Sequence, residues 1–186
     1  LQGAAFLAGI PGTLGGALAM NAGAYGGEIA DVLVAVETID ARGELHRWPP
    51  EAFDFAYRHA ALPEGHWFIA AHLGLAGGGD PEVLRAQTKE LLGRRSRSQP
   101  LERPNAGSVF RNPPGDHAGR LIEASGLKGA RQGEAEVSPR HANFIVNRGG
   151  ATAADIEALM RRVQERVEAD SGVWLEPEVR IVGEAA

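Results

Sequence analysis

The chain has 186 residues, 44% of them hydrophobic, and a formal net charge of −5, which suits one large or two small domains with a real core. An acidic chain with no basic cluster is unsuited to nucleic acid, and the absence of cysteine excludes a disulfide frame, a thiol nucleophile and a thiolate metal site. No segment has the apolar length of a membrane span, and no signal peptide is recognisable. We therefore expect a cytoplasmic protein that needs neither nucleic acid nor membrane, with no required protein partner evident.

Glycines crowd residues 9–27, and apolar side chains lie between them where a flexible linker would carry serine and charge. The pattern predicts a tight turn and then a helix from about Thr13, which is a suitable N-cap residue. Free N–H groups at a helix start attract anions, and missing side chains let a diphosphate come close. Close packing of the helix on small residues is the alternative explanation. The spacing matches neither a P-loop nor the usual dinucleotide fingerprint, which favours a flavin or a nucleotide-sugar.

The next residues predict a small β-rich part. Runs rich in Val and Ile, or alternating in polarity, indicate strands at 32–39, 44–48 and 67–75. Residues 55–60 resemble a strand with one polar face that carries Tyr57, Arg58 and His59. Asp80 and Pro81 begin a helix that we expect to end near Gly93. The basic, polar stretch 94–103 then predicts a linker, which gives domains at 1–93 and 104–186.

The second part predicts a helix at 117–125, strands at 134–137 and 143–147, and a long capped helix. Thr152 and Asp155 have the form of a capping box, and one apolar face follows them to about Ala169. Residues 173–182 predict a terminal strand, on which Glu178 and Arg180 share a face. The stretch 104–113 gathers polar side chains around a small apolar centre, namely Asn105, Ser108, Arg111 and Asn112. An ordinary turn into a strand explains this last stretch equally well.

Several motifs occur in an order that resembles the UDP-N-acetylenolpyruvoylglucosamine reductases. They are Gly9-Ile-Pro-Gly-Thr-Leu-Gly-Gly16 with Asn21-Ala-Gly-Ala-Tyr25, Tyr57-Arg58, Asn105-Ala-Gly-Ser-Val-Phe-Arg-Asn-Pro113, His141-Ala-Asn-Phe-Ile-Val-Asn147 and Leu175-Glu-Pro-Glu-Val-Arg-Ile-Val-Gly183. The resemblance covers essentially the whole chain and implies an α+β fold. It implies the second lobe of a vanillyl-alcohol-oxidase-type FAD-binding domain, followed by a smaller α+β substrate-binding domain. We expect the first FAD lobe of such an enzyme to precede Leu1.

The resemblance also implies a reaction. In this family NADPH reduces FAD and leaves, and a UDP-sugar enolpyruvyl ether takes its place. Hydride passes from flavin N5 to C3 of the substrate and a proton goes to C2, which gives UDP-N-acetylmuramate for peptidoglycan. By motif, Ser108 corresponds to the proton donor, and Arg58 and Glu178 to the pair that stabilises the enolic intermediate. Substrate contacts are implied for Tyr57, Asn112 and His141, and FAD contacts for Gly9, Ile10, Pro11, Gly12, Thr13, Gly15, Gly16 and Ala17.

The chemistry of these side chains suits that reaction. Hydride addition pushes negative charge into the carboxyl group of the substrate, so the site needs positive charge and hydrogen-bond donors there. Arg58 is always charged and can bind a carboxylate with two hydrogen bonds, while a buried, protonated Glu178 could donate a further one. No cluster of metal ligands is apparent, and none is required. The interval of about fifty residues between Arg58 and Ser108 resembles the subgroup that lacks an extra substrate-capping insertion.

Two other functions remain open from the sequence. Another flavin oxidoreductase of the same superfamily would lack the Asn-Ala-Gly-Ser and Glu-Pro-Glu-Val-Arg motifs. A nucleotide-sugar-binding fragment without redox activity is the non-enzymatic alternative, because a chain without the first lobe is expected to hold little FAD.

Overall fold

The computed structural model describes residues 1–183. It divides the chain into two compact units, Leu1–Arg95 and Ser96–Ala186, and the boundary falls inside helix α2 (Pro81–Ser98). The helix therefore does not end near Gly93, and the first half of the expected linker 94–103 is helical. A lone glycine costs a helix only about 1 kcal/mol, and the next residue that cannot continue the helix is Pro100.

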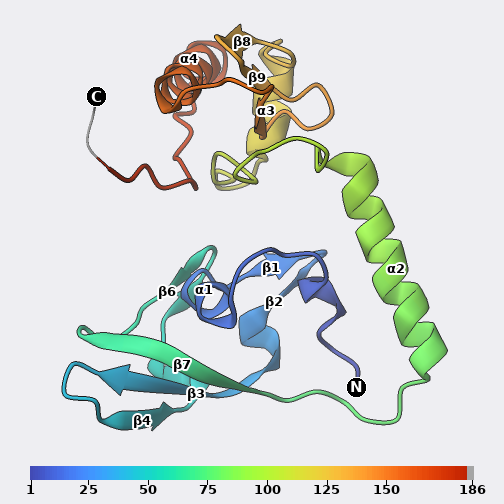
Figure 1. The fold of residues 1–186 in the computed structure, drawn as a ribbon, viewed down its shortest axis with the longest axis vertical. Helices are drawn as coiled ribbons and strands as arrows, with labels where there is room; N and C mark the ends of the chain where they lie inside the picture. Colours follow the sequence, from blue (N-terminus) through green and yellow to red (C-terminus); the bar gives the residue numbers. More distant parts are fainter. Residues whose placement is uncertain (184–186) are drawn as a thin grey trace. The chain divides into compact units, whose positions relative to one another are not determined.

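The first unit is built on a three-stranded antiparallel sheet in the order β4-β3-β7 (Figure 1). Its strands are β3 (Leu33–Asp40), β4 (Leu45–Trp48) and β7 (His66–Leu73), and Val36 lies opposite both Trp48 and Ala71. Helix α1 (Leu14–Ala19) packs beside β7 and begins as expected, with Thr13 Oγ1 accepting a hydrogen bond from Gly16 N–H at 3.1 Å. The core of this unit comprises Leu18, Ile29, Leu33, Val36 and Phe53.

Two short hairpins complete the first unit. One pairs β1 (Gly23–Ala24) with β2 (Gly27–Glu28), and the other pairs β5 (Phe55–Ala56) with β6 (His59–Ala60). Residues 55–60 are thus a hairpin and not the single strand that the sequence predicted. The chain reverses at Tyr57 and Arg58, where Arg58 has a left-handed φ of 55°.

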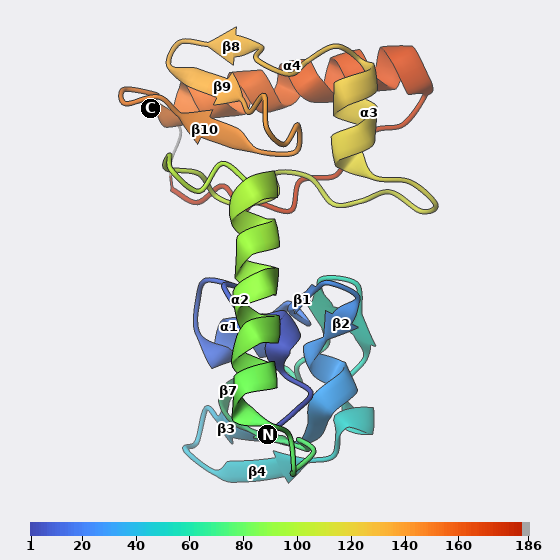
Figure 2. The same cartoon turned by 90° about the vertical axis from the view of Figure 1, so that its right-hand side faces the viewer.

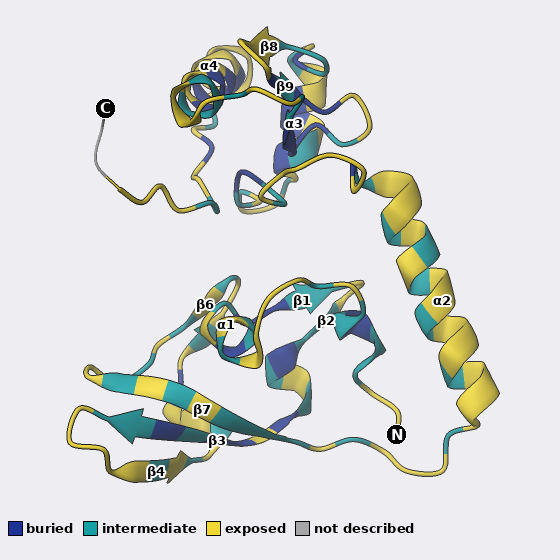
Figure 3. Cartoon of the chain, viewed as in Figure 1, coloured by how far each residue is buried: buried dark blue, intermediate teal, exposed yellow. Residues whose placement is uncertain are grey.

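The second unit packs α3 (Ala118–Ala124) and α4 (Ala153–Ser171) with a small antiparallel sheet in the order β10-β9-β8 (Figure 2). The strands are β8 (Arg131–Gln132), β9 (Ala135–Val137) and β10 (Ile145–Asn147). The predicted capping box of α4 is present, and the inner face of the helix, dark blue in Figure 3, carries Leu159, Met160, Val163 and Val167. The sequence did not predict β8, which is only a two-residue strand.

The expected strand at 173–182 is absent from the structure. Within this segment a single bridge joins Pro177 to Phe110, and the hydrogen bonds run from Arg111 N–H to Glu176 O and from Glu178 N–H to Val109 O, both 2.8 Å. Pro177 has no N–H to extend a ladder, so the pairing stays irregular. Among residues 1–183, no helix is long and apolar enough to cross a membrane.

Candidate active site

The glycine-rich turn before α1 leaves room for a ligand at its tip. Gly12 has a φ of 118°, and a methyl group added to it would meet nothing within 4 Å. At Gly15 and Gly16 an added methyl group would make only ordinary contacts, 3.9 and 3.5 Å from Thr13 Oγ1. The first N–H groups of a helix have no partner within the helix, and here they lie beside these bare glycines. The residues of this turn therefore fit the close approach of a diphosphate.

Other glycines of the same stretch are explained by packing. A methyl group on Gly9 would lie 2.8 Å from Leu92 Cδ2 of α2, and one on Gly27 would lie 3.0 Å from the ring of Phe6. One on Gly23 would lie 2.7 Å from Gly27 O. Close packing thus explains Gly9, Gly23 and Gly27, whereas the space at Gly12, Gly15 and Gly16 is compatible with a bound diphosphate. Among the other residues expected to contact FAD, Ile10 and Pro11 lead into the turn, whereas Ala17 packs against the core.

Arg58 stands at the tip of the β5–β6 hairpin in a strained backbone conformation. Its Nη2 donates to Gly23 O at 3.2 Å, and its guanidinium lies 4.9 Å from the centre of the Tyr57 ring. The side chain of Tyr57 is exposed. A bulky residue with positive φ is uncommon and persists where the surrounding structure holds it, often at functional sites.

The hairpin is held by Asn21, which is fully buried. Its Nδ2 donates to Ala56 O and its Oδ1 accepts from Ala30 N–H, both at 3.2 Å. Asn21 thereby ties the strand that leads to Arg58 to the loop after α1. The sequence placed Asn21 in a family motif without giving it a role, and no local signal connects it to a residue far along the chain.

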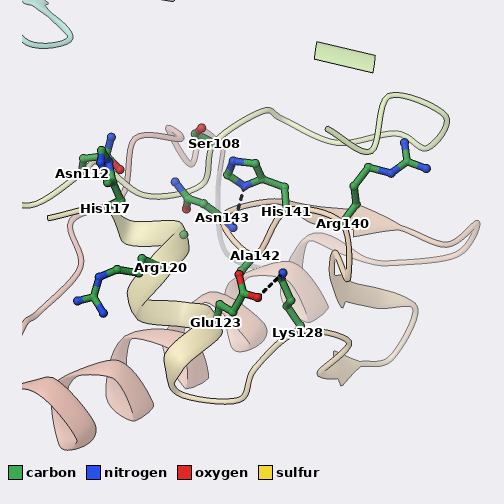
Figure 4. A pocket seen from close by; sticks show the side chains of 11 residues that line it. Ser108, Asn112, His117, Arg120, Glu123, Lys128, Arg140, His141, Ala142 and Asn143 are labelled. Carbon is green, nitrogen blue, oxygen red and sulfur yellow. Dashed lines mark hydrogen bonds and ion pairs between the residues drawn. The ribbon is translucent and has the colours of Figure 1, made fainter. Parts of the chain in front are cut away.

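A pocket of about 400 Å³ lies in the second unit beside the start of α3 (Figure 4). Ser108, Asn112 and His141, all expected in the site, line it together. Its other lining residues are mainly charged or polar and include Arg120, Lys128, Arg140, Glu123, His117 and Asn143. Within residues 1–183, the hydroxyl of Ser108 makes no hydrogen bond, so it is available to a bound molecule.

Ser108 and Glu178 are brought together through the backbone. Val109, the residue after Ser108, accepts the hydrogen bond from Glu178 N–H at 2.8 Å and is itself buried. Two of the three residues expected to be catalytic thus lie on adjacent segments of the second unit. Arg58 belongs to the first unit, and the structure does not place the two units relative to each other.

Three basic side chains line the pocket, and each forms an ion pair with an acidic side chain. Lys128 Nζ lies 2.7 Å from Glu123 Oε1, Arg140 Nη1 lies 2.9 Å from Glu102 Oε2, and Arg120 pairs with Asp116. Hydrogen bonds from Arg120 and from the His117 backbone lower the pKa of Asp116 to about 2. Basic side chains already oriented by hydrogen bonds are suited to bind phosphate oxygens.

Burial lowers the pKa of His141, and the nearby charge of Lys128 acts in the same direction. His141 is therefore neutral at pH 7, with Nδ1 accepting a hydrogen bond from Asn143 N–H at 3.3 Å. Its ring packs against Phe144 and over Gly119, where a methyl group would lie 3.4 Å from Cε1. Asn112 also has a structural contact, because its Oδ1 accepts from Ala118 N–H at the start of α3.

One group of potential metal ligands lies outside this site. Among the described residues, Asp40, Glu44 and His46 have ligand atoms within 4.8 Å of one another. Arg42 Nη2 already lies 3.5 Å from the Asp40 carboxylate and 3.4 Å from that of Glu44. Arg42 thus offsets part of the negative charge of these two carboxylates in the turn between β3 and β4.

Comparison with known proteins defines the class and then the family. Residues 1–48 match the family of FAD binding domains, so the chain begins with part of a flavoprotein fold. Residues 99–182 match the C-terminal domain of UDP-N-acetylenolpyruvoylglucosamine reductase. The chain belongs to the UDP-N-acetylenolpyruvoylglucosamine reductase family.

Similar proteins agree with this assignment. The chain is 60% identical over 185 residues to the UDP-N-acetylenolpyruvoylglucosamine reductase of Alkalilimnicola ehrlichii, covering 100% of this chain and 62% of that protein. It is 61% identical over 183 residues to the one from Methylococcus capsulatus, covering 98% of this chain and 60% of that protein. The crystal structure of UDP-N-acetylenolpyruvylglucosamine reductase from Thermus caldophilus superposes with a TM-score of 0.81 at 43% identity, over 96% of this chain and 64% of that one. The chain thus spans about three-fifths of the length of these relatives.

Proposed function

We propose that the full-length protein containing this chain reduces UDP-N-acetylglucosamine enolpyruvate to UDP-N-acetylmuramate, with NADPH as reductant and FAD as cofactor. The observation that carries the proposal is the joining of Ser108 and Glu178 through Val109 at the edge of a pocket lined by cations. Membership of the reductase family supports the substrate, and the open glycine turn supports FAD.

We assign the nucleotide diphosphate of the substrate to the pocket of the second unit. Its volume of about 400 Å³ suits part of a nucleotide-sugar. Lys128 and Arg140 supply charge for phosphate oxygens, and neutral His141 can exchange a hydrogen bond without adding a further charge. Asn112 contributes by fixing the start of α3, which forms one wall.

Gly12, Thr13, Gly15 and Gly16 would hold FAD, and the bound flavin, reduced by NADPH, would supply a hydride for C3 of the substrate. The side chains of the protein then have to stabilise the negative charge that develops on the substrate and supply the proton for C2. As the new C–H bond forms at C3, the electron pair of the double bond moves onto C2 and the carboxyl group. We assign Arg58 and Glu178 to the stabilisation of that charge, and the Ser108 hydroxyl to the donation of the proton to C2. One hydride and one proton are added, and the ether bond to the sugar stays intact.

Replacing Ser108 by Ala separates the two halves of this reaction. Reduction of FAD by NADPH needs no proton at C2 and should stay nearly normal. Reoxidation by the enolpyruvyl substrate should slow at least about 100-fold, since a positioned general acid contributes roughly 10²–10⁴-fold. Stopped-flow absorbance of the flavin measures both steps, and Ser108→Cys should recover part of the loss because its proton is more acidic.

Ser125→Ala is the matched control for this experiment. Ser125 follows α3 in the same unit and does not line the pocket, so both half-reactions should keep their wild-type rates. A reoxidation rate for Ser108→Ala within about threefold of wild type at saturating substrate would refute the acid assignment. Binding of the nucleotide-sugar without any flavin absorbance in the purified full-length protein would instead favour the non-redox function.

A further inference from the structure

Asn143 forms hydrogen bonds with the backbone immediately after Ser108. Its Nδ2 donates to Phe110 O at 2.8 Å, and its Oδ1 accepts from Phe110 N–H at 3.0 Å. Its own backbone oxygen accepts from Val109 N–H at 2.9 Å. Figure 4 shows Asn143 among the residues that line the pocket, together with Ser108 and His141. Three hydrogen bonds thus connect one residue to the pair that follows the expected acid.

The contact is buried, which makes its geometry demanding. Asn143 is 4% exposed, Val109 3% and Phe110 1%, so water cannot replace a lost partner. An amide side chain offers one donor and one acceptor in a plane, which matches the N–H and C=O of Phe110. Alanine or leucine would leave both backbone groups unpaired, and glutamine is one methylene too long.

The same short segment is held from its other edge by the chain that carries Glu178. Arg111 N–H donates to Glu176 O, and Val109 O accepts from Glu178 N–H. Since the Ser108 hydroxyl makes no hydrogen bond of its own within residues 1–183, the backbone of residues 108–110 is what sets the position of its Cβ and so the points that the hydroxyl can reach. That backbone is fixed between Asn143 and Glu178.

We propose that Asn143 is a positioning residue that aims the Ser108 hydroxyl at the carbon to be protonated. This inference rests on the proposed function, because it acts through the assigned acid. Misplacing a catalytic group by about 1 Å typically costs on the order of 10²-fold in rate. Asn143→Ala should therefore slow reoxidation of the flavin by substrate about 10²-fold, while flavin reduction by NADPH stays normal.

A double-mutant cycle in the full-length, FAD-loaded protein separates positioning from general damage. If Asn143 acts through Ser108, adding Asn143→Ala to Ser108→Ala should slow reoxidation by less than about threefold further. Independent effects that multiply would overturn the proposal. Asn147→Ala is the matched control, because its amide also bonds backbone groups, those of Gly149 and Ala151, in the same unit but not beside Ser108. It should leave both half-reactions unchanged.

Asn143→Asp gives a second test with a distinct signature. A carboxylate keeps an acceptor for Phe110 N–H but cannot donate to Phe110 O, whereas a protonated carboxyl can. The reoxidation rate of Asn143→Asp, divided by that of wild type at each pH, should rise as pH falls. This variant decides the question if Asn143→Ala does not fold, and a flat ratio that equals one would overturn the proposal.

Amide hydrogen exchange in the chain itself provides a readout that needs no cofactor. Asn143→Ala should speed exchange at Val109 and Phe110 at least about tenfold relative to the rest of the unit, and Asn147→Ala should not. Unchanged protection at these two amides would overturn the proposal. Failure of the proposed function looks different, since the wild-type protein itself would then show no reoxidation by substrate.

Discussion

Adding one methyl group at Gly15 should move stability and cofactor affinity in opposite directions. The added Cβ would lie 3.9 Å from Thr13 Oγ1 and 4.0 Å from Phe68 Cβ, which are ordinary contacts. Alanine in a helix is favoured over glycine by roughly 0.5–1 kcal/mol. Gly15→Ala should thus stabilise the first unit by that amount and raise its unfolding midpoint by a few degrees, about 4–8 °C per kcal/mol for a domain of this size.

The same methyl group would stand where a diphosphate is expected to approach the start of α1. Losing one hydrogen bond to a charged group costs about 1.5–3 kcal/mol, which is roughly a 10- to 150-fold loss of FAD affinity. Thermal unfolding of the chain measures the first effect. Titration of the full-length apoprotein with FAD, followed by flavin fluorescence, measures the second.

Gly77→Ala is the control, because a methyl group there meets nothing within 4 Å and the residue lies outside the glycine turn. It should leave the FAD affinity unchanged. The reasoning is refuted if Gly15→Ala binds FAD as tightly as wild type, since the bare face of α1 would then serve packing alone. A loss of stability in Gly15→Ala would contradict the contact distances themselves.

Two further predictions concern the second unit. Thr152→Ala removes the hydroxyl that accepts from Asp155 N–H and should lower the free energy of unfolding by about 1 kcal/mol in urea, without changing ligand binding to the pocket. His141→Gln should reduce the pH dependence of stability. Because the pKa of His141 is lowered in the folded chain, the unfolded chain takes up this proton first as pH falls through about 6.5. Wild type therefore loses stability in that range of pH. Urea denaturation at about pH 7.5 and about pH 5.5 measures this difference, and an equal loss of stability in the variant would contradict the prediction. The Asp116 and Asp155 carboxyls have lowered pKa values, so they titrate well below this pH range.

Elements whose signals are local could be predicted from the sequence. The caps at Thr13 and Thr152 each join groups within three residues, and both helices begin where the sequence indicated. Two strands of the central sheet also follow from local patterns, β3 from its run of Val and Ile and β7 from alternating side chains. Such features need no knowledge of distant parts of the chain.

Features that depend on distant contacts could not be predicted. The hairpin at residues 55–60 requires a left-handed Arg58, and its strand is held by Asn21, 35 residues from Ala56. The segment around Glu178 resembles a strand until Pro177 interrupts its pairing with Phe110.

The residues of the candidate site also fall into those that the sequence could indicate and those that it could not. Family motifs identified Ser108, Asn112 and His141, which line one pocket, but gave no signal that Asn143 holds Phe110 by both amide groups.

The left-handed backbone at Arg58 has an evolutionary consequence. This conformation disfavours arginine by about 1–2 kcal/mol, and the hydrogen bond from its guanidinium to Gly23 O offsets about the same amount. The contact of its guanidinium with the Tyr57 ring adds to that offset, so the hairpin tolerates an arginine where glycine or asparagine would meet less backbone strain. If Arg58 serves the proposed reaction, related sequences that have lost this reaction should replace the arginine early while they keep Asn21 and the buried core.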